Sequence, residues 1–464
     1  MHTWKNQLNL ATVRRSLSLV PFDTQTEQGR SDERYRLAAL SILTNVLSRL
    51  IGVVAMLLSV SLTVPYLGVE RFGVWMTIAS FAGLLTFLDL GIGNALTNHV
   101  AHRAATEDPD LLSQTISGGL AFLALIGMGM ALLLYLIAAN LPWHILVKVD
   151  QPALLPEARL AAMCFALLFG FHIFTSGIQR VFAGMQQAYL GHLATALGSL
   201  VACFGLWFSA GSHQGIPVLL TVMLGSQSAA GLLLLGLLFA RRQFTFVGIL
   251  GFAKLESTHL FRAGGLFFIL QIGTMVGWGA DSLLIASTLG VAQVAIYSVV
   301  QRLFQFATQP LGIMNAPLWG AYADAHVRND KIFIKKTLKK SMILTLSGAS
   351  LVSAFLLHFH PWLIEKWTHG KIAVPLLLVA IYAVWVVLDA CGNAFAMFLN
   401  GCNIIKQQIV TVIILTSIAL PVKIISINYY GVSGLVSSYS LIYFIVVIIM
   451  YGIYYKKEIR ENIE

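Results

Sequence analysis

Charged residues are scarce in this sequence. Asp, Glu, Lys and Arg together make up 11% of its 464 residues, whereas soluble globular proteins contain roughly 25%. Hydrophobic residues make up 57% of the chain, and its mean hydropathy is +0.79. A chain of this composition cannot cover its surface with groups that water solvates. The composition therefore excludes a water-soluble globular protein and predicts a polytopic membrane protein.

Cysteine is also rare, and no nucleotide-binding motif is present. The four cysteines lie in or beside apolar stretches without metal-ligand spacing, so they predict neither a disulfide framework nor a metal site; they are Cys164, Cys203, Cys391 and Cys402. No Gly-rich loop ends in Gly-Lys-Ser or Gly-Lys-Thr. We therefore expect no cofactor, and uphill transport would have to use an ion gradient or the substrate's own gradient.

Apolar runs long enough to cross a bilayer, about 20 residues each, follow one another along the chain. They lie at about 38–64, 72–96, 115–140, 157–179, 194–211, 216–240, 264–288, 294–320, 341–361, 373–399, 409–427 and 433–455. They predict an all-α integral membrane protein with 12 transmembrane helices, six on each side of a hydrophilic stretch. The domains expected are a basic N-terminal tail (1–36), a six-helix lobe (37–240), a connector (241–263), a second six-helix lobe (264–455) and a C-terminal tail (456–464).

The distribution of basic residues predicts the orientation of these helices. With the N-terminus in the cytoplasm, 22 of the 30 Lys and Arg residues fall in cytoplasmic segments and five in external ones. This bias predicts that both termini are cytoplasmic. It also indicates that the net charge of +10 faces anionic lipid headgroups rather than nucleic acid.

A sequence repeat relates the two halves. Leu67-Gly68-Val69 returns 222 positions later as Leu289-Gly290-Val291, and the six residues 90–95 return 221 positions later as 311–316 with five identities. Two matches in the same order predict an internal duplication and two pseudo-symmetric lobes, a common plan of secondary transporters.

Polar residues inside the apolar runs form stripes at helical spacing. The stripes comprise Ser41, Asn45, Ser48, Gly52, Ser59 and Thr63 in the first run, Thr77, Ser80, Gly91 and Asn94 in the second, Gln271, Thr274, Trp278 and Asp281 in the seventh, and Ser298, Gln301, Arg302, Gln305, Thr308, Gln309, Gly312 and Asn315 in the eighth. Such residues can bond neighbouring helices together. Their occurrence in two symmetry-related pairs of helices favours a central aqueous cavity between the lobes.

Three basic residues fall within the predicted spans. Arg49 has no acidic residue nearby in its helix, so it is the stronger candidate to bind an anion. Arg302 and Asp281 lie at similar predicted depth, so they form either a structural ion pair or part of a binding site, and both hold if the pair breaks on substrate or proton binding. We further predict that Asp281 couples the charge of the cavity to transport. Lys423 lies near a helix end, where snorkelling to the interface would explain it.

The run YLGVERFGVWMTIASFAGLLTFLDLGIGNAL, residues 66–96, closely resembles the second-helix signature of the polysaccharide transporters, or O-antigen type flippases. These share a superfamily with the multidrug and toxin extrusion antiporters. The resemblance implies two six-helix lobes around a cavity in the bacterial inner membrane. It also implies a flippase that moves undecaprenyl-pyrophosphate-linked oligosaccharide from the cytoplasmic to the periplasmic leaflet. This oligosaccharide would be a repeat unit either of an O-antigen, which is part of lipopolysaccharide, or of an exopolysaccharide. Polysaccharide polymerase machinery is a further expected partner, beside membrane lipids.

The residue types of the stripes agree with such a substrate. A pyrophosphate needs guanidinium donors, and sugars need amide, hydroxyl and aromatic partners. The expected cavity residues are Arg49, Arg302, Asn45, Gln271, Trp278, Gln305 and Gln309, with Asp281 as the coupling residue. Two alternatives remain open. An ion-coupled multidrug antiporter would need an acidic cavity for organic cations, and a membrane glycosyltransferase would need a larger external domain than the longest predicted external loop, 141–156.

Overall fold

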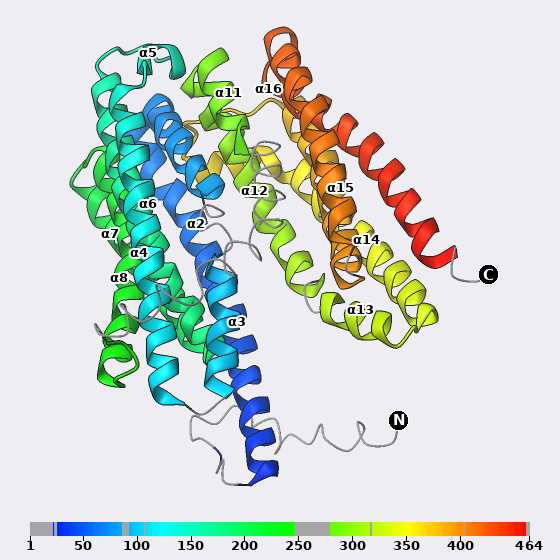
Figure 1. Ribbon diagram of the computed structural model, residues 1–464. Helices are drawn as coiled ribbons and strands as arrows, with labels where there is room; N and C mark the ends of the chain where they lie inside the picture. The colour runs from blue at the N-terminus through cyan, green and yellow to red at the C-terminus, as the bar shows by residue number, and fades with distance from the viewer. Residues whose placement is uncertain are drawn as a thin grey trace. The chain divides into compact units, whose positions relative to one another are not determined.

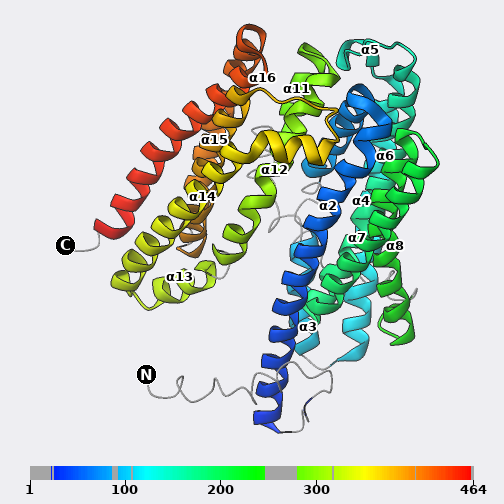
Figure 2. The same cartoon turned by 180° about the vertical axis from the view of Figure 1, so that it is seen from behind.

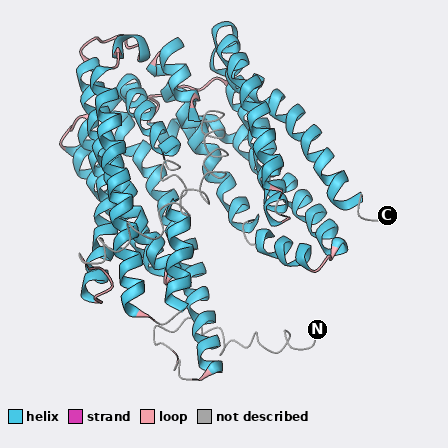
Figure 3. Cartoon of the chain, in the orientation of Figure 1, coloured by secondary structure: helices cyan, strands magenta, loops and turns pink. Residues whose placement is uncertain are grey.

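The computed structural model describes residues 22, 26–85, 92–105, 108–245, 279–315, 318–402 and 404–460. In these residues the regular structure is helical (Figure 3). Its elements are α2 (Glu27–Leu85), α3 (Ile92–Ala105), α4 (Pro109–Asn140), α5 (Trp143–Leu146), α6 (Leu154–Gly184), α7 (Ala188–Gly211), α8 (Ile216–Ala240), α11 (Asp281–Thr288), α12 (Val291–Asn315), α13 (Leu318–Val327), α14 (Lys331–Thr368), α15 (Leu376–Gly401) and α16 (Ile405–Arg460).

Eight helices of the described residues are long and apolar enough to cross a membrane, which confirms the predicted class of all-α membrane protein. Two of these stretches, Arg36–Ser80 and Gln407–Tyr454, contain 45 and 48 residues. At 1.5 Å per residue each would measure about 70 Å, more than twice a hydrocarbon core of about 30 Å. Each is interrupted by a glycine with left-handed backbone, Gly68 (φ 72°) in α2 and Gly431 (φ 63°) in α16. Each stretch is therefore two helical segments joined at a tight turn, and both turns fall between predicted apolar runs.

Several boundaries differ from the sequence prediction. α2 begins at Glu27, inside the predicted tail, because the Thr26 hydroxyl accepts the Gly29 backbone N–H at 3.0 Å and caps the first turn. The predicted run 294–320 is divided between α12 and α13, which begins at Leu318. Most of the predicted run 264–288 lies outside the described residues.

The chain forms two compact units. The first, here the N-unit, comprises Met1–Met56, Thr86–Asn140 and Ala161–Leu266; the second, the C-unit, comprises Leu57–Leu85, Leu141–Leu160 and Phe267–Glu464. The C-unit thus contains two segments from the first half of the sequence.

Small residues allow the helices of the N-unit to pack closely. A Cβ on Gly127 of α4 would lie 2.3 Å from the backbone oxygen of Gly170 in α6, so the two helix backbones touch there. α7 and α8 are joined by a hydrogen bond from the Gln227 side-chain amide to the Ser199 hydroxyl at 3.1 Å. Close approach of backbones at small residues and hydrogen bonds between polar side chains are both common between helices in membranes.

An aromatic core holds α13, α14, α15 and α16 of the C-unit together; these elements are followed along the chain in Figures 1 and 2. Tyr322, Ile334, Leu338, Phe398 and Tyr454 are buried members of one cluster. The rings of Tyr322 and Phe398 meet edge to face with centroids 5.8 Å apart, a favourable geometry for aromatic pairs. This cluster fixes which face of α14 points into the unit.

The two matched Leu-Gly-Val motifs form turns of the same kind within the C-unit. Gly68 and Gly290 both have positive φ, 72° and 94°, a conformation that favours glycine. The segment Leu141–Leu160 contacts both turns. The Lys148 N–H donates to Ala286 O at 3.1 Å and Lys148 O accepts from Val291 N–H at 3.1 Å, while Glu70 accepts the N–H groups of residues 150 and 151. The repeat is therefore visible in the backbone of these two turns.

Candidate functional site

The polar stripe predicted on the eighth run lies on α12 and changes in exposure along the helix. Ser298 is buried, Arg302 is half-buried, and Gln305, Gln309 and Gly312 are exposed. Large polar side chains on the outside of an apolar helix are unfavourable in hydrocarbon, so they normally face a polar partner or an aqueous cavity. This stretch of α12 is therefore the candidate binding surface of the C-unit.

Asn315, at the end of the same stripe, has a different environment. It is 1% exposed, and its amide donates to the Thr345 hydroxyl of α14 at 3.0 Å. Asn315 therefore bonds two helices together, the ordinary structural use of a polar residue in a membrane helix.

Arg302 contacts the polar stripe of the first predicted run. One of its Nη groups donates to the Ser59 hydroxyl of α2 at 2.9 Å, and Ser59 is 2% exposed. The hydroxyl of Thr63 donates to the Ser59 backbone oxygen at 2.6 Å, one turn back along the helix. The structure thus brings together residues of two predicted stripes within the C-unit. Among the described residues Arg302 forms no ion pair. The Ser59 hydroxyl accepts its hydrogen bond but leaves its positive charge without a counter-charge.

The expected pairing of Asp281 with Arg302 is wrong. Asp281, at the start of α11, pairs instead with Lys423 of α16, with Nζ and Oδ1 2.7 Å apart. Both side chains are buried, with exposed fractions of 9% and 1%. The expectation that Lys423 snorkels to the interface is wrong for the same reason. Similar predicted depth on consecutive helices was compatible with a pair but could not identify a partner 142 positions away.

Aromatic residues complete the surroundings of this ion pair. The Tyr297 hydroxyl donates to the other Asp281 oxygen at 3.2 Å, and the Lys423 ammonium lies 3.8 Å from the centre of the Tyr439 ring. The Trp385 ring lies 5.0 Å beyond Tyr439. Two charges buried away from water are stable only because each is paired with the opposite charge and hydrogen-bonded. We call this group, formed by Asp281, Lys423, Tyr297 and Tyr439, the buried charge cluster.

Two members of the buried charge cluster, Tyr297 and Tyr439, were absent from the sequence prediction, and a third, Lys423, was assigned to the interface instead of to an ion pair. A signal for Lys423 was available, because a lysine and an aspartate that both fall inside apolar runs are expected to neutralise each other. Nothing comparable marked the two tyrosines among the many aromatic residues of the chain.

The predicted site residues of the first run lie in the N-unit. Arg49 is exposed, and its Nε donates to the Asn45 side-chain oxygen at 3.1 Å, one turn earlier on α2. The contact turns the guanidinium along the helix without neutralising its charge. Arg49 and Asn45 thus form a second cationic position on an apolar helix.

Two predicted binding residues, Gln271 and Trp278, lie outside the described residues, as does Thr274. Within the described part of the chain, no group of three or more His, Cys, Asp or Glu side chains is placed to hold a metal ion.

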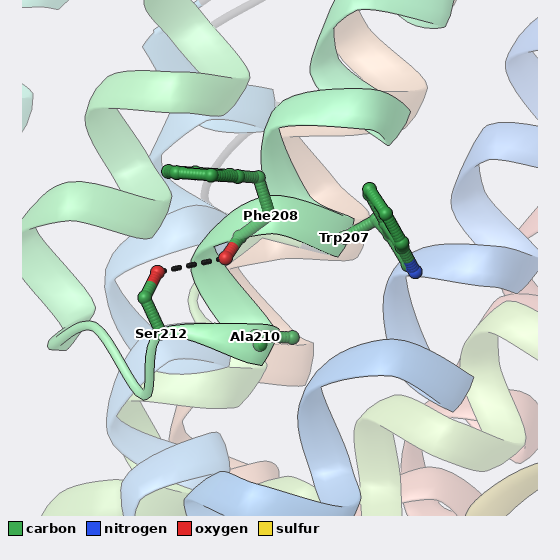
Figure 4. A pocket seen from close by; sticks show the side chains of 5 residues that line it. Trp207, Phe208, Ala210 and Ser212 are labelled. Carbon is green, nitrogen blue, oxygen red and sulfur yellow. Dashed lines mark hydrogen bonds between the residues drawn. The ribbon is translucent and has the colours of Figure 1, made fainter.

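A separate pocket lies at the end of α7 in the N-unit (Figure 4). It is lined by Trp207, Phe208, Ala210, Gly211 and Ser212. The Ser212 hydroxyl donates to the Phe208 backbone oxygen at 2.7 Å. The lining thus carries no charge, and its mainly apolar character does not suit an anionic headgroup.

The chain is similar to proteins of polysaccharide biosynthesis and O-antigen export. The family model described as polysaccharide biosynthesis protein matches residues 37–318. A protein of Yersinia pseudotuberculosis described as an O-antigen export protein is 22% identical over 406 residues, which cover 84% of this chain and 89% of that protein.

The solved structures that resemble this one are membrane transporters. An inward-facing multidrug resistance MATE family transporter of the MOP superfamily matches with a TM-score of 0.74 and 15% identity, covering 89% of this chain and 98% of that one. A mutant MATE transporter of Vibrio cholerae matches with a TM-score of 0.63 and 13% identity, covering 92% and 98%. A MOP superfamily transporter from Pyrococcus furiosus, whose binding pocket has reversed polarity, matches with a TM-score of 0.61 and 15% identity, covering 92% and 96%. The fold is therefore MATE-like.

Proposed function

Because the chain belongs to the polysaccharide biosynthesis protein family, we propose that it is a flippase for undecaprenyl-pyrophosphate-linked oligosaccharide. It moves an O-antigen or exopolysaccharide repeat unit from the cytoplasmic to the periplasmic leaflet by alternating access. Family and fold indicate a transporter rather than an enzyme, which leaves the glycosyltransferase alternative without support.

The observation that carries this proposal is the environment of Arg302. Its guanidinium is half-buried on a helix of the C-unit and donates to a neutral hydroxyl. A cation in such a place keeps its charge available for an anionic ligand, and guanidinium binds phosphate oxygens through two parallel hydrogen bonds. The exposed amides of Gln305 and Gln309 follow on the same face of α12 and supply donors and acceptors that suit sugar hydroxyls.

Arg49 and Asn45 form the corresponding position of the N-unit. The exposed Arg49 guanidinium and the half-buried Asn45 amide offer the same chemistry, a hydrogen-bond donor to phosphate beside a partner for sugar hydroxyls. Gln271 and Trp278 complete the proposed set of substrate-binding residues.

The architecture that this mechanism needs is the one expected from the sequence. We propose 12 transmembrane helices in two pseudo-symmetric six-helix lobes around a central cavity, with the domain limits 1–36, 37–240, 241–263, 264–455 and 456–464. The protein lies in the bacterial inner membrane with both termini in the cytoplasm. Polysaccharide polymerase machinery is its proposed partner on the product side.

The buried charge cluster is the proposed coupling site. Asp281 and Lys423 neutralise each other in this structure, so any rearrangement of α11 against α16 that separates them leaves two unpaired charges in a dry environment. Protonation of Asp281 would remove one of these charges and make the separated state accessible. The pair thus offers a way to link proton uptake to a conformational change.

Charge exchange tests the coupling proposal. The swap Asp281→Lys with Lys423→Asp should restore folding and membrane abundance but not export, because the carboxylate then lies on the other helix. Full rescue of export would show that the pair is only structural. Normal export by an Asp281→Asn variant at every external pH would also exclude the coupling role.

A flippase-null strain tests the substrate proposal. Surface glycan should be lost with Arg302→Ala and with Arg49→Ala, and partly retained with Arg→Lys at either position because the charge remains. Lys366→Ala, which removes an exposed charge at the end of α14, is the matched control and should export normally. Membrane levels of each variant are measured in parallel. Wild-type export by the Arg49→Ala, Arg302→Ala double variant would contradict the proposal.

The runner-up is an ion-coupled multidrug antiporter, favoured by the MATE-like fold. An organic cation needs an available carboxylate, and the buried Asp281 is already neutralised by Lys423. Drug tolerance separates the two functions. An antiporter would raise the tolerance of a pump-deficient strain to cationic dyes, whereas a flippase would restore surface glycan and leave tolerance unchanged.

A further inference from the structure

A dense group of lysines lies at the start of α14. Lys335, Lys336, Lys339 and Lys340 are all exposed, and they fall within six consecutive residues, or about 9 Å of helix at 1.5 Å per residue. Their spacings of one, four and five place them on one side of the helix. We call these four residues the lysine face. Neither the polar stripes nor the transport mechanism uses them.

The lysine face is held in a fixed orientation. The helix is capped by Asp330, whose carboxylate accepts the Phe333 backbone N–H at 2.9 Å. On the other side of the helix, Ile334 and Leu338 are buried in the aromatic core of the C-unit, and Ser341 and Thr345 continue the buried side. α14 therefore cannot turn its lysines inward without breaking that core.

The carboxylates nearest in sequence are already engaged. Asp330 caps α14, and Asp324 accepts from Arg328 at 2.9 Å. Among the described residues, none of the four lysines forms an ion pair. The positive charges of the lysine face are therefore available to an anionic partner that is not part of this chain.

Apolar residues flank these charges on the same exposed side. Ile332 is 81% exposed and Phe333 40% before the lysines, and Ile343 is 57% exposed and Leu344 53% after them. A face that pointed into water would place these four large side chains in water as well. A face that lies at the bilayer surface puts the apolar side chains against acyl chains, while the lysine stems extend to the headgroups.

We propose that the lysine face is a binding surface for anionic phospholipid headgroups, such as those of phosphatidylglycerol, which anchors α13 and the start of α14 at the membrane surface. A cluster of four or more basic residues next to a transmembrane helix is attracted by anionic lipid. The flanking apolar residues favour lipid over a soluble acidic partner. The inference does not depend on which substrate the protein carries.

Lipid retention by the full-length protein tests this proposal. The purified protein is equilibrated in detergent with equal amounts of phosphatidylglycerol and phosphatidylcholine, and bound lipid is counted by mass spectrometry. We expect the wild type to enrich phosphatidylglycerol. The Lys339→Gln, Lys340→Gln variant should lower that enrichment about 25-fold, since each lysine near a lipid surface contributes roughly fivefold to binding.

Matched variants keep the result interpretable. The pair Lys366→Gln, Lys371→Gln removes two exposed lysines, one in the last turn of α14 and one just after the helix, and should leave the enrichment unchanged. Lys339→Arg, Lys340→Arg keeps the charge and should retain it, which separates lost charge from lost folding. Equal enrichment in the wild type and the Lys339→Gln, Lys340→Gln variant would overturn the proposal. An equal fall in both glutamine pairs would overturn it too, because the effect would then be one of net charge.

Discussion

Two basic residues of the C-unit, Arg302 and Lys423, both come from apolar helices but have opposite environments. Arg302 is half-buried and donates to the neutral Ser59 hydroxyl at 2.9 Å. Lys423 is 1% exposed, touches a carboxylate at 2.7 Å and lies against an aromatic ring. A cation with a neutral partner keeps its net charge for a ligand, whereas a cation with a carboxylate does not. The comparison therefore supports the proposals that Arg302 binds substrate and that Lys423 has a structural or coupling role.

Removal of one charge from the buried pair should have the largest effect on stability. Lys423→Ala leaves the Asp281 carboxylate buried without a counter-charge, which costs about 3–5 kcal/mol for a buried pair. We expect a large fall in thermal stability and membrane abundance, measured by unfolding of the detergent-solubilised protein.

A double variant distinguishes charge from packing in that result. Lys423→Met with Asp281→Asn removes both charges, keeps an acceptor for Tyr297, and should recover most of the stability. If Lys423→Ala alone unfolds at the wild-type temperature, the pair does not hold the helices together and the contrast with Arg302 fails.

The Tyr297 hydroxyl should have an intermediate effect. Tyr297→Phe deletes the donor to Asp281, whose bond measures 3.2 Å, and hydrogen bonds to charged groups contribute roughly 1.5–3 kcal/mol. Because Lys423 still balances the carboxylate, we expect the lower end of that range in the same unfolding assay. Tyr443→Phe removes a buried hydroxyl of α16 that is hydrogen-bonded to neither Asp281 nor Tyr297 in the described part of the chain, and it is the control. If the control variant loses more stability than Tyr297→Phe, the bond from Tyr297 to Asp281 does not make the expected contribution.

An ion pair near the start of α2 should have the smallest effect. Arg36 donates to both oxygens of Glu33, at 2.8 and 2.6 Å, and this hydrogen bond lowers the pKa of Glu33. Ion pairs of this spacing contribute about 0.2–0.5 kcal/mol in isolated helices, and the low exposure of Arg36 (5%) and Glu33 (15%) favours the upper end of that range. Since the pKa is lower in the folded state, the contribution is present above the unfolded pKa and is lost as pH falls through the folded pKa. Glu33→Gln should therefore reduce stability slightly at pH 7 and should have no effect at a pH below the folded pKa of Glu33.

The sequence predicted those features that depend on local spacing. Apolar runs of spanning length gave the helical membrane class, and the repeated Leu-Gly-Val motifs marked two turns in which Gly68 and Gly290 share positive φ. The polar stripes also predicted that Ser59 and Arg302 face the same region, because helical periodicity determines which side of a helix a residue occupies.

Contacts between distant helices could not be predicted in the same way. Periodicity assigns a face to Asp281 and to Lys423 but does not say which helices are neighbours, and the two residues are 142 positions apart. Asn315 shows the same limit: it lies on the predicted stripe, but its partner is Thr345 of α14. The N-terminal limit of α2 was missed because Thr26, its cap, lies in a polar segment without hydrophobic periodicity.

Binding of undecaprenyl pyrophosphate to the purified protein tests the central claim most directly. The affinity of the wild type is compared with those of Arg302→Gln and of Lys366→Gln as the charge-matched control. Loss of a charge-assisted bond to phosphate, about 1.5–3 kcal/mol, predicts at least a tenfold weaker Kd for Arg302→Gln and an unchanged Kd for the control. An Arg302→Gln protein that binds the pyrophosphate as tightly as the wild type would contradict the account.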